Sequence, residues 1–420
     1  MTKATDRNLI VGLDIGTTKV AVLVGEVLPD GEINIVGLGT HAARGMDKGG
    51  VNDLESVVKS LQRAVDEAEM MADCHISTVF LGISGRHMHI ECRNEKGMVP
   101  ISDEEVTQED VDNVIHTAKS VRLPEEHRVL HVLPQEYSID YQEGIKNPIG
   151  LSGVRMGAKV HLITCHNDMA RNIEKCVERV GLKVDQLIFS ALASSYAVLT
   201  EDEKELGVCV VDIGSGTMDL AVFTGGALRF TKVIPYAGNA VTSDIAYAFG
   251  TPPVDAEAIK VRYGCALGRL VSKEDTIEVP SVGGRPARSL QRQTLAEVIE
   301  PRYSELLGMV HDELQRVQNE LRAQGVKHQL AAGVVLTGGA AQIEGIVECA
   351  EQIFQCQVRV GEPMNVRGLT DYVQAPAFST AVGLLQYGKM HQGMGVRDAS
   401  VKTSVGGLFK RLSTWLRGEF

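Results

Sequence analysis

No apolar run in this sequence approaches the ~20 residues that a membrane-spanning helix needs. The short apolar stretch from Leu9 to Val11 is soon interrupted by Asp14 and lacks the flanks of a signal peptide. We therefore expect the chain to stay in the cytoplasm. Basic residues are outnumbered, because 42 Lys and Arg stand against 54 Asp and Glu, for a formal net charge of −12. This balance argues against general nucleic-acid binding, since neutralising phosphates takes clustered Lys and Arg.

Several familiar site motifs are missing. None of the eight cysteines forms a C-x-x-C pair or sits beside a histidine at zinc-ligand spacing, which predicts reduced thiols in a cytosolic protein. The 12 histidines are scattered, His161 and His166 show no metal-ligand spacing, and only His87 and His89, an H-x-H pair, would share a face of a strand, so we do not expect histidine to bind a metal. The sequence has no G-x-x-x-x-G-K-S/T loop and no G-x-G-x-x-G fingerprint. A nucleotide site in this chain must therefore be of another type.

One pattern occurs twice. Residues 9–26 read LIVGLDIGTTKVAVLVGE and residues 207–223 read GVCVVDIGSGTMDLAVF. Each is a pair of β-rich runs joined by a short turn after Asp-Ile-Gly, and a third β-rich run follows each, at 33–38 and 227–234. A duplication about 200 residues apart predicts two similar lobes with a cleft between them. The 420 residues suit two or three domains at ~100–200 residues each.

Both turns have the chemistry of a phosphate clamp. Glycines let backbone N–H groups approach phosphate oxygens closely, and hydroxyls and a lysine add donors. Asp14 and Asp212 end their strands at the turns, where carboxylates can hold a hydrated Mg²⁺. A single copy could be only a hairpin turn, but two matching copies favour the clamp. The candidate binding residues are Gly16, Thr17, Thr18 and Lys19 in the first turn and Gly214, Ser215, Gly216 and Thr217 in the second.

A third element follows in the second half of the chain. Residues 334–345 read VVLTGGAAQIEG, a buried strand, a Gly-Gly pair and the start of a helix. Paired glycines at such a junction permit close approach of a flat ligand such as a nucleoside, although many α/β turns look like this. The candidates here are Gly338, Gly339, Ala340 and Gln342.

Together and in this order, the three elements resemble the phosphate-1, phosphate-2 and adenosine motifs of the actin-like ATPase superfamily. The resemblance implies an α/β, actin-like two-lobe fold of duplicated ribonuclease-H-like cores that binds ATP and Mg²⁺. Glu257 and Lys260, in the stretch DAEAIK, resemble adenine and ribose contacts, and Gly238 and Asn239 precede that helix at the cleft. An exposed helix with a weak ion pair is the other interpretation of Glu257 and Lys260.

Within that superfamily, the whole chain resembles the FtsA family of bacterial cell-division proteins. The segments that carry the resemblance are GMDKGGVNDLESV, VLPQEYSIDYQEGIKNPIGLSGVRM, TPPVDAEAIKVRYG, SVGGRP and the Trp-containing basic tail. The resemblance implies inserted subdomains 1C and 2B within cores 1A and 2A. The expected divisions are 1A at 1–84, 164–204 and 376–388, 1C at 85–163, 2A at 205–234 and 331–375, 2B at 235–330, a flexible linker at 389–404 and an amphipathic membrane-targeting helix at 405–420.

The family resemblance also implies partners and a place in the cell. It implies self-association into filaments and recruitment of the tubulin-like FtsZ to the cytoplasmic face of the inner membrane, where the division ring is assembled and activated. Subdomain 2B would receive the C-terminal peptide of FtsZ, and 1C would contact other division proteins. Four arginines form a local basic patch that could pair with acidic groups of that peptide, unless they are ordinary solvated charges. They are Arg285, Arg288, Arg292 and Arg302.

The tail can be interpreted on its own. Residues 396–420 carry a formal charge of +3, while the rest of the chain carries −15. Apolar side chains recur at helical spacing, with basic ones elsewhere on the helix, which is typical of a reversible interfacial membrane anchor. The alternative is a helix docked on the protein's own core. The apolar face is Leu408, Phe409, Leu412, Trp415 and Leu416, and the basic residues are Lys410, Arg411 and Arg417.

Three functions compete. The leading one is an ATP-binding, filament-forming membrane adaptor with at most weak ATPase activity. A small-molecule kinase of the same superfamily would need a carboxylate positioned to take the acceptor's proton, and the sequence identifies no catalytic residue. An actin-like pilus-assembly ATPase is the third.

Overall fold

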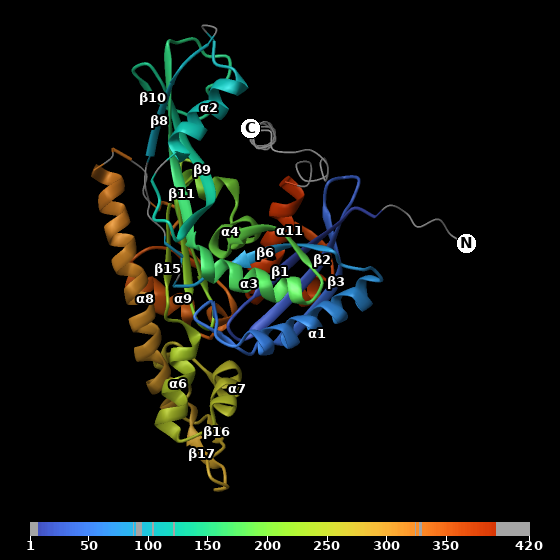
Figure 1. Ribbon diagram of the computed structural model, residues 1–420. Coiled ribbons are helices and arrows are strands. Elements are labelled where there is room, and N and C mark those ends of the chain that lie inside the picture. Colours follow the sequence, from blue (N-terminus) through green and yellow to red (C-terminus); the bar gives the residue numbers. More distant parts are fainter. Residues whose placement is uncertain are drawn as a thin grey trace.

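A computed structural model describes residues 7–391, apart from residues 87, 90–94, 103–104, 121, 324 and 327–329. The predicted membrane helix and all but the first three residues of the predicted linker lie outside the described residues. Figure 1 shows two lobes with an inserted unit at the top and helices gathered at the bottom. None of the described helices is long and apolar enough to cross a membrane.

Two sheets of the same design form the centres of the lobes. In lobe I the strand order is β12-β6-β1-β2-β3-β20, and in lobe II it is β15-β14-β13-β18-β19. In each sheet three consecutive strands form an antiparallel meander, and two later strands continue the sheet in parallel beyond the first of them. In lobe I, β20 also pairs in parallel with the other edge of the meander, at β3. This confirms the predicted duplicated two-lobe fold. The strands are β1 Leu9–Ile15, β2 Lys19–Val27, β3 Ile33–Ala42, β6 Thr78–Ile83, β12 Lys183–Phe189 and β20 Val366–Gly368, and β13 Val208–Ile213, β14 Met218–Thr224, β15 Ala227–Ile234, β18 Val334–Thr337 and β19 Val358–Val360.

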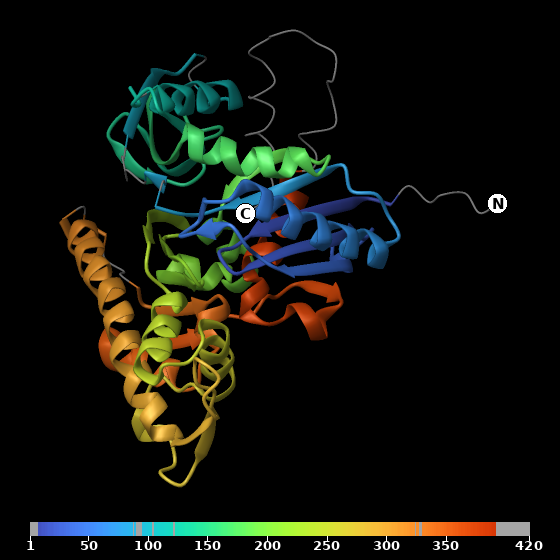
Figure 2. The same cartoon turned by 60° about the horizontal axis from the view of Figure 1, so that its bottom comes forward.

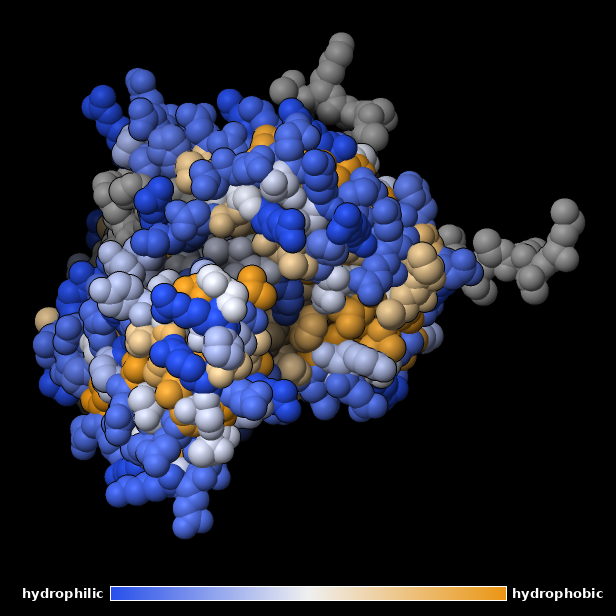
Figure 3. All heavy atoms as spheres, turned by 90° about the horizontal axis from the view of Figure 1, so that it is seen from below, coloured by the Kyte–Doolittle hydropathy of each residue, from blue (hydrophilic) through white to orange (hydrophobic). Residues whose placement is uncertain are grey.

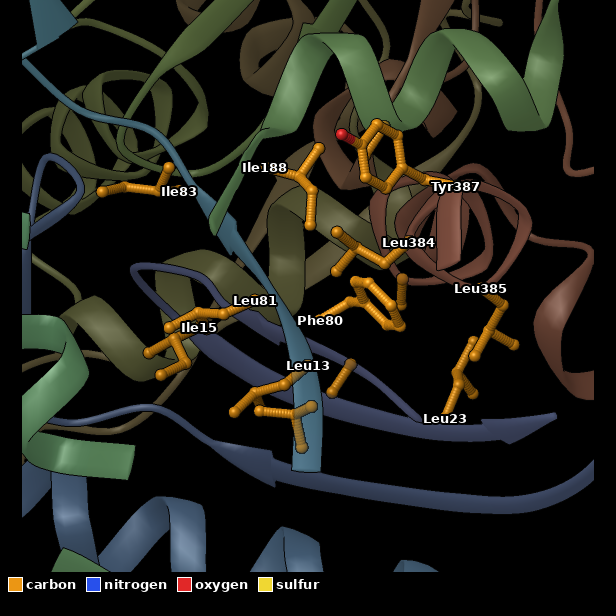
Figure 4. Close-up of a cluster of buried hydrophobic side chains, with 14 of the residues drawn as sticks. Leu13, Ile15, Leu23, Phe80, Leu81, Ile83, Ile188, Leu384, Leu385 and Tyr387 are labelled. Atoms are coloured by element: carbon orange, nitrogen blue, oxygen red, sulfur yellow. The ribbon is translucent and has the colours of Figure 1, made fainter. Parts of the chain in front are cut away.

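Helices cover the lobe I sheet. α1 (Leu54–Ala72) packs on β2 and β3 beside α3 (Asn167–Arg179), whereas α4 (Ser190–Val198) and α11 (Ser379–His391) pack together over β1 and β6. Figure 4 shows Leu384 of α11, Phe80 of β6 and Ile188 of β12 pointing toward one another in this core. The strands read as nearly continuous apolar runs because both faces of the sheet are buried.

The inserted unit has a sheet of its own. Its strand order is β10-β9-β11-β7, and β8 also pairs with β11. Among its described residues, twelve buried side chains from α2, the strands and the loop before α2 form a separate core. The unit stands at the upper left in Figure 2. Its two longest strands extend down to β15 of lobe II (Figure 1). The elements are β7 Met88–His89, β8 Glu95–Pro100, α2 Gln108–Lys119, β9 His127–Ile139, β10 Gln142–Ile145 and β11 Arg155–His166.

Lobe II carries the helices at the bottom of Figure 1 and the long helix along its left side. Apolar residues recur at helical spacing along that part of the sequence, which predicts one apolar stripe, and the stripe is buried from Ile299 to Leu321. Figure 3 looks at the bottom end, where orange hydrophobic side chains lie among blue ones and the surface is hollowed toward lobe I. The exposed hydrophobic residues there include Tyr247, Val254 and Val261. The elements are α6 Gly238–Phe249, α7 Pro253–Tyr263, β16 Thr276–Val279, β17 Arg288–Gln291, α8 Arg292–Ala323 and α9 Ile346–Phe354.

Short elements complete the chain. They are β4 Met46–Asp47, β5 Gly50–Val51, α5 Glu201–Leu206, α10 Thr370–Val373 and the 3₁₀ turns Gly268–Leu270, Gly339–Gln342 and Pro376–Phe378. The chain passes from lobe I to lobe II through α5 and returns after β19. The second crossing is fastened to α4, because Met364 N–H donates to Ala197 O at 2.9 Å.

Candidate functional site

The two hairpin turns face a cavity of about 630 Å³ between the lobes. Its volume lies within the ~300–1,000 Å³ typical of small-molecule sites. It is lined by every residue that the sequence predicts to bind the nucleotide or Mg²⁺, except Asn239. The Asn239 N–H donates to Ser215 O at 2.8 Å instead. The predicted residues that line it are Asp14, Gly16, Thr17, Thr18, Lys19, Asp212, Gly214, Ser215, Gly216, Thr217, Gly238, Glu257, Lys260, Gly338, Gly339, Ala340 and Gln342.

The turns touch each other across the cavity. Thr18 Oγ1 donates to Ser215 Oγ at 3.0 Å, and a Cβ on Gly216 would overlap Thr17 Oγ1, so only glycine permits this approach. The amide N–H groups of Thr17, Thr18, Ser215 and Gly216 donate to no acceptor in the described chain. Unpaired amides in consecutive turn residues form concavities that bind anions.

Three carboxylates line the cavity below the turns. Asp14 is on β1, and Asp212 on β13 pairs directly with Asp219 on β14, so the two side chains share a face. Ser84 Oγ donates to Asp219 at 2.5 Å, and Thr380 Oγ1 donates to Asp212 at 2.9 Å. The hydroxyl of Ser194 on α4 also donates to Asp212.

Four of these residues were not predicted. Asp219 could have been found, because Asp212 and Asp219 lie symmetrically about the predicted hairpin turn. Ser84, Ser194 and Thr380 come from three distant segments, and no local motif points to them.

Burial opposes the charges of these groups. It raises the pKa of Asp14 to about 6 against the nearby Lys19 ammonium, and it raises the pKa of Asp212. Burial and the neighbouring Asp212 raise the pKa of Asp219 well above its ordinary value. Burial also lowers the pKa of Lys19, whose Nζ donates to Ala377 O at 2.6 Å and lies 3.8 Å from the centre of the Phe378 ring. Crowded carboxylates with one lysine favour binding of a further cation.

The other end of the cavity is built from the Gly-Gly pair. Gly338 has a φ of +89° after β18, and a Cβ there would overlap Asp212 Oδ1. The predicted helix does not start at once, because a 3₁₀ turn at Gly339–Gln342 precedes α9. A Cβ on Gly339 would meet only Ala377 Cβ, at 3.8 Å. Tyr303 of α8 supports the turn from below by donating to Ala340 O at 2.8 Å.

Lys260 and Glu257 form more than an exposed ion pair. Lys260 is buried, and its Nζ lies 2.7 Å from Glu257 Oε2 and donates to Thr242 Oγ1 at 2.9 Å and to Gly238 O at 3.1 Å. The pair therefore fastens α7 to α6 at the wall of the cavity.

The four arginines differ in their surroundings. Arg302 pairs with Asp244 at 2.5 Å, and Arg292 pairs with Glu344. Arg288 donates to Phe249 O. Arg285, in the exposed β16–β17 loop, makes no hydrogen bond or ion pair with the described residues.

Two matching sheets that enclose this cavity define an actin-like ATPase fold. The solved PilM-PilN type IV pilus biogenesis complex matches with a TM-score of 0.64 at 17% identity, over 90% of this chain and 98% of that chain. MreB5 of Spiroplasma citri bound to ADP matches with a TM-score of 0.51 at 14% identity, over 91% of this chain and 96% of that chain. At these identities the likeness shows the fold alone.

The chain belongs to the FtsA family of cell division proteins. It is 73% identical over 422 residues to the cell division protein FtsA of Escherichia coli strain K12 and 52% identical over 426 residues to that of Pseudomonas aeruginosa, covering all of each chain. The family model for cell division protein FtsA matches residues 209–383, and the model for the SHS2 domain inserted in FtsA matches residues 88–164. The protein is therefore a cell-division protein with an actin-like fold.

Proposed function

We propose that the chain is an ATP-binding, self-associating membrane adaptor that tethers FtsZ filaments to the inner membrane and helps assemble and activate the division ring. The observation that carries the nucleotide part is the cavity where four unpaired amides, Lys19 and three carboxylates converge. The same fold holds nucleotides elsewhere, because MreB5 of Spiroplasma citri has been solved with ADP and with AMPPNP.

The residues present suit ATP. The amides of Thr17, Thr18, Ser215 and Gly216 would bind phosphate oxygens, with Lys19 as their counter-charge. The adenosine would lie against the Gly338–Gln342 turn, beside Glu257 and Lys260. The open space at Gly339 is where its flat base could approach the backbone.

The carboxylates suit Mg²⁺ held through water. Among the described residues no group of three His, Cys, Asp or Glu side chains is arranged to bind a metal directly. Mg²⁺ usually keeps several waters and takes one or two carboxylates together with substrate phosphates. Asp14 and Asp212 would supply those carboxylates, and the ion would offset their repulsion.

A pair of substitutions at Gly339 tests the nucleotide site. Gly339→Arg should fill the cavity and abolish binding of fluorescent ATP, whereas Gly339→Ala should bind like the parent because its Cβ has room. Equal binding by the parent and Gly339→Arg, or no binding by the parent, would contradict the proposal. Circular dichroism of both variants checks that they are folded.

The adaptor part rests on family membership and on the tail. We propose that the apolar face around Trp415 anchors the chain reversibly to anionic lipid, that the exposed Arg285 loop contributes to the site for the FtsZ C-terminal peptide, and that the inserted unit contacts other division proteins. The likeness to the PilM-PilN complex concerns the fold alone, and the full-length identity to FtsA proteins favours the adaptor over a pilus ATPase or a kinase.

A further inference from the structure

A short hairpin of lobe I reaches the nucleotide cavity. Its strands β4 and β5 are joined by Lys48 and Gly49, whose φ values of +45° and +78° are typical of a two-residue hairpin turn. The turn is tightly seated, because a Cβ on Gly49 would overlap the carbonyl oxygen of Ser84. Gly49 itself lines the nucleotide cavity. The hairpin therefore fixes the backbone of Lys48 beside that cavity.

The hairpin touches the end of the cavity that lies away from the Gly-Gly pair, where the adenosine would lie. The second hairpin turn starts near that pair, since a Cβ on Gly238 would lie 3.2 Å from both Gly214 O and Ala340 Cβ. Gly216 is two residues further along, and a Cβ there would lie 3.2 Å from Lys48 Cα. The Gly216 N–H is among the unpaired amides proposed to bind phosphate. The backbone of Lys48 is therefore next to the place expected for the terminal phosphate.

The Lys48 ammonium has an aromatic partner in the other lobe. Its Nζ lies 4.5 Å from the centre of the Tyr236 ring, and Tyr236 is 49% exposed. No carboxylate of the described residues forms an ion pair with Lys48. A cation–π contact at an exposed site is weak, so an anion with better geometry can replace the ring.

The charges that line the cavity leave room for another cation. Lys19 and Lys260 are its basic residues in the described chain, and Lys260 is already paired with Glu257. Lys19 therefore faces three carboxylates and, in the proposed complex, the triphosphate as well. The flexible stem of Lys48 would let a second ammonium reach that phosphate from the edge of the cavity.

We propose that Lys48 binds the terminal phosphate of ATP, and that Tyr236 holds its ammonium in the nucleotide-free protein. When ATP binds, Nζ leaves the ring and donates a charge-assisted hydrogen bond to a terminal phosphate oxygen. The hairpin belongs to lobe I and Gly216 to lobe II, so the same phosphate then joins the two lobes. ADP lacks this phosphate, so Lys48 distinguishes ATP from ADP. The inference rests on the nucleotide site proposed above.

Calorimetric titration of the full chain with AMPPNP and with ADP, each with Mg²⁺, tests this role. Lys48→Gln should bind AMPPNP about tenfold more weakly, because it loses a charge-assisted hydrogen bond, and should bind ADP like the parent. Lys48→Arg should keep AMPPNP binding because it keeps the charge. Tyr236→Leu should bind AMPPNP a few-fold more tightly, because no ring competes for the ammonium. Lys59→Gln, at an exposed position on α1, is the matched control and should bind both nucleotides like the parent.

Other outcomes would overturn the proposal. Equal affinity of Lys48→Gln and the parent for AMPPNP would remove Lys48 from the phosphate. Equal losses for AMPPNP and ADP, shared by Tyr236→Leu, would show that the pair only holds the lobes together. A folded parent that binds neither nucleotide would contradict the nucleotide site itself, whereas a parent that binds both and an unaffected Lys48→Gln would contradict this inference alone.

Discussion

One residue in the nucleotide cavity, Asp14, makes the free energy of unfolding depend on pH. Burial raises the pKa of Asp14 to about 6, whereas the unfolded chain has the ordinary pKa of 3.8. Between these two pH values, the folded protein holds a proton on Asp14 that the unfolded chain has already released. The stabilisation is complete below pH 3.8 and is lost as the pH rises through about 6.

Asp14→Asn should therefore remove part of the pH dependence in the nucleotide-free protein. The free energy of unfolding of the parent should fall, relative to the variant, by up to about 3 kcal/mol between pH 4 and pH 7. Urea unfolding across that range measures it. Asp66→Asn, at an exposed site on α1, controls for loss of a carboxylate and should give a flat difference. If the difference in free energy of unfolding between the parent and Asp14→Asn did not change with pH, the raised pKa of Asp14 would be contradicted.

A second prediction about a single residue concerns Arg285 and the proposed binding of the FtsZ C-terminal peptide. Arg285→Glu should weaken binding of an FtsZ C-terminal peptide several-fold without loss of stability, because Arg285 is exposed and makes no hydrogen bond or ion pair with the described residues. Fluorescence anisotropy of the labelled peptide measures it, with Arg285→Lys as the charge-retaining control. Unchanged affinity would remove Arg285 from the interface. Reversing Arg302 or Arg292 would be less clear, since each is already ion-paired.

Among the elements, α11 and α4 cross in close contact. A Cβ on Gly383 of α11 would overlap the carbonyl oxygen of Ala193, so the two helices can approach only because residue 383 is glycine. Gly308 of α8, also helical, has no atom within 4 Å of a built Cβ.

Two glycine-to-alanine substitutions should therefore change the free energy of unfolding in opposite directions. Gly383→Ala should destabilise the fold by about 1–3 kcal/mol through overpacking. Gly308→Ala should stabilise it by about 0.5–1 kcal/mol, because alanine is the better helix former. Chemical unfolding measures both. A neutral Gly383→Ala would show that α11 and α4 can separate without cost.

Element boundaries were less predictable than element types. The acidic residues that follow Ser102 predict a helix over Ser102–Val121, because they suit the first turn of a helix. The helix α2 begins only at Gln108, because Thr107 and Asp110 form the capping box and Val106 is hydrogen-bonded to Gly150 and Leu151 instead. For α1, the spacing of Asn52 and Glu55 predicts a capping box, and this prediction is wrong, because the cap is Asp53, whose side chain accepts from Ser56 N–H. In both cases the sequence offers more than one polar residue that could cap the helix, and the surrounding backbone decides which one serves.

For the whole molecule, charge separates the body from the tail. The acidic body should be repelled by an anionic bilayer, while the +3 segment from residue 396 onward should be attracted to it. In the proposed adaptor, one basic amphipathic tail would bind reversibly, and many tails on one filament would bind by avidity. Anchoring and self-association should therefore reinforce each other.

Trp415→Glu should release the protein from anionic liposomes, because it places a charge in the apolar face. Co-sedimentation measures this, and Trp415→Phe should keep binding. Electron microscopy on lipid monolayers with ATP should show filaments with the full chain and none with a chain that ends at Met390. Unchanged sedimentation of Trp415→Glu would contradict the anchor.

The sequence alone determined the paired hairpins, the Gly-Gly turn, the buried stripe of α8 and the two-lobe fold, because periodicity and turn chemistry are local properties. Only the tertiary structure decided which distant residues meet. It placed Ser84 on Asp219 and Thr380 on Asp212, paired Arg302 with Asp244, and docked the inserted unit on lobe II, where Gln135 Nε2 donates to Leu228 O. These contacts join segments up to 168 residues apart, and they depend on how whole elements pack, which no local pattern records.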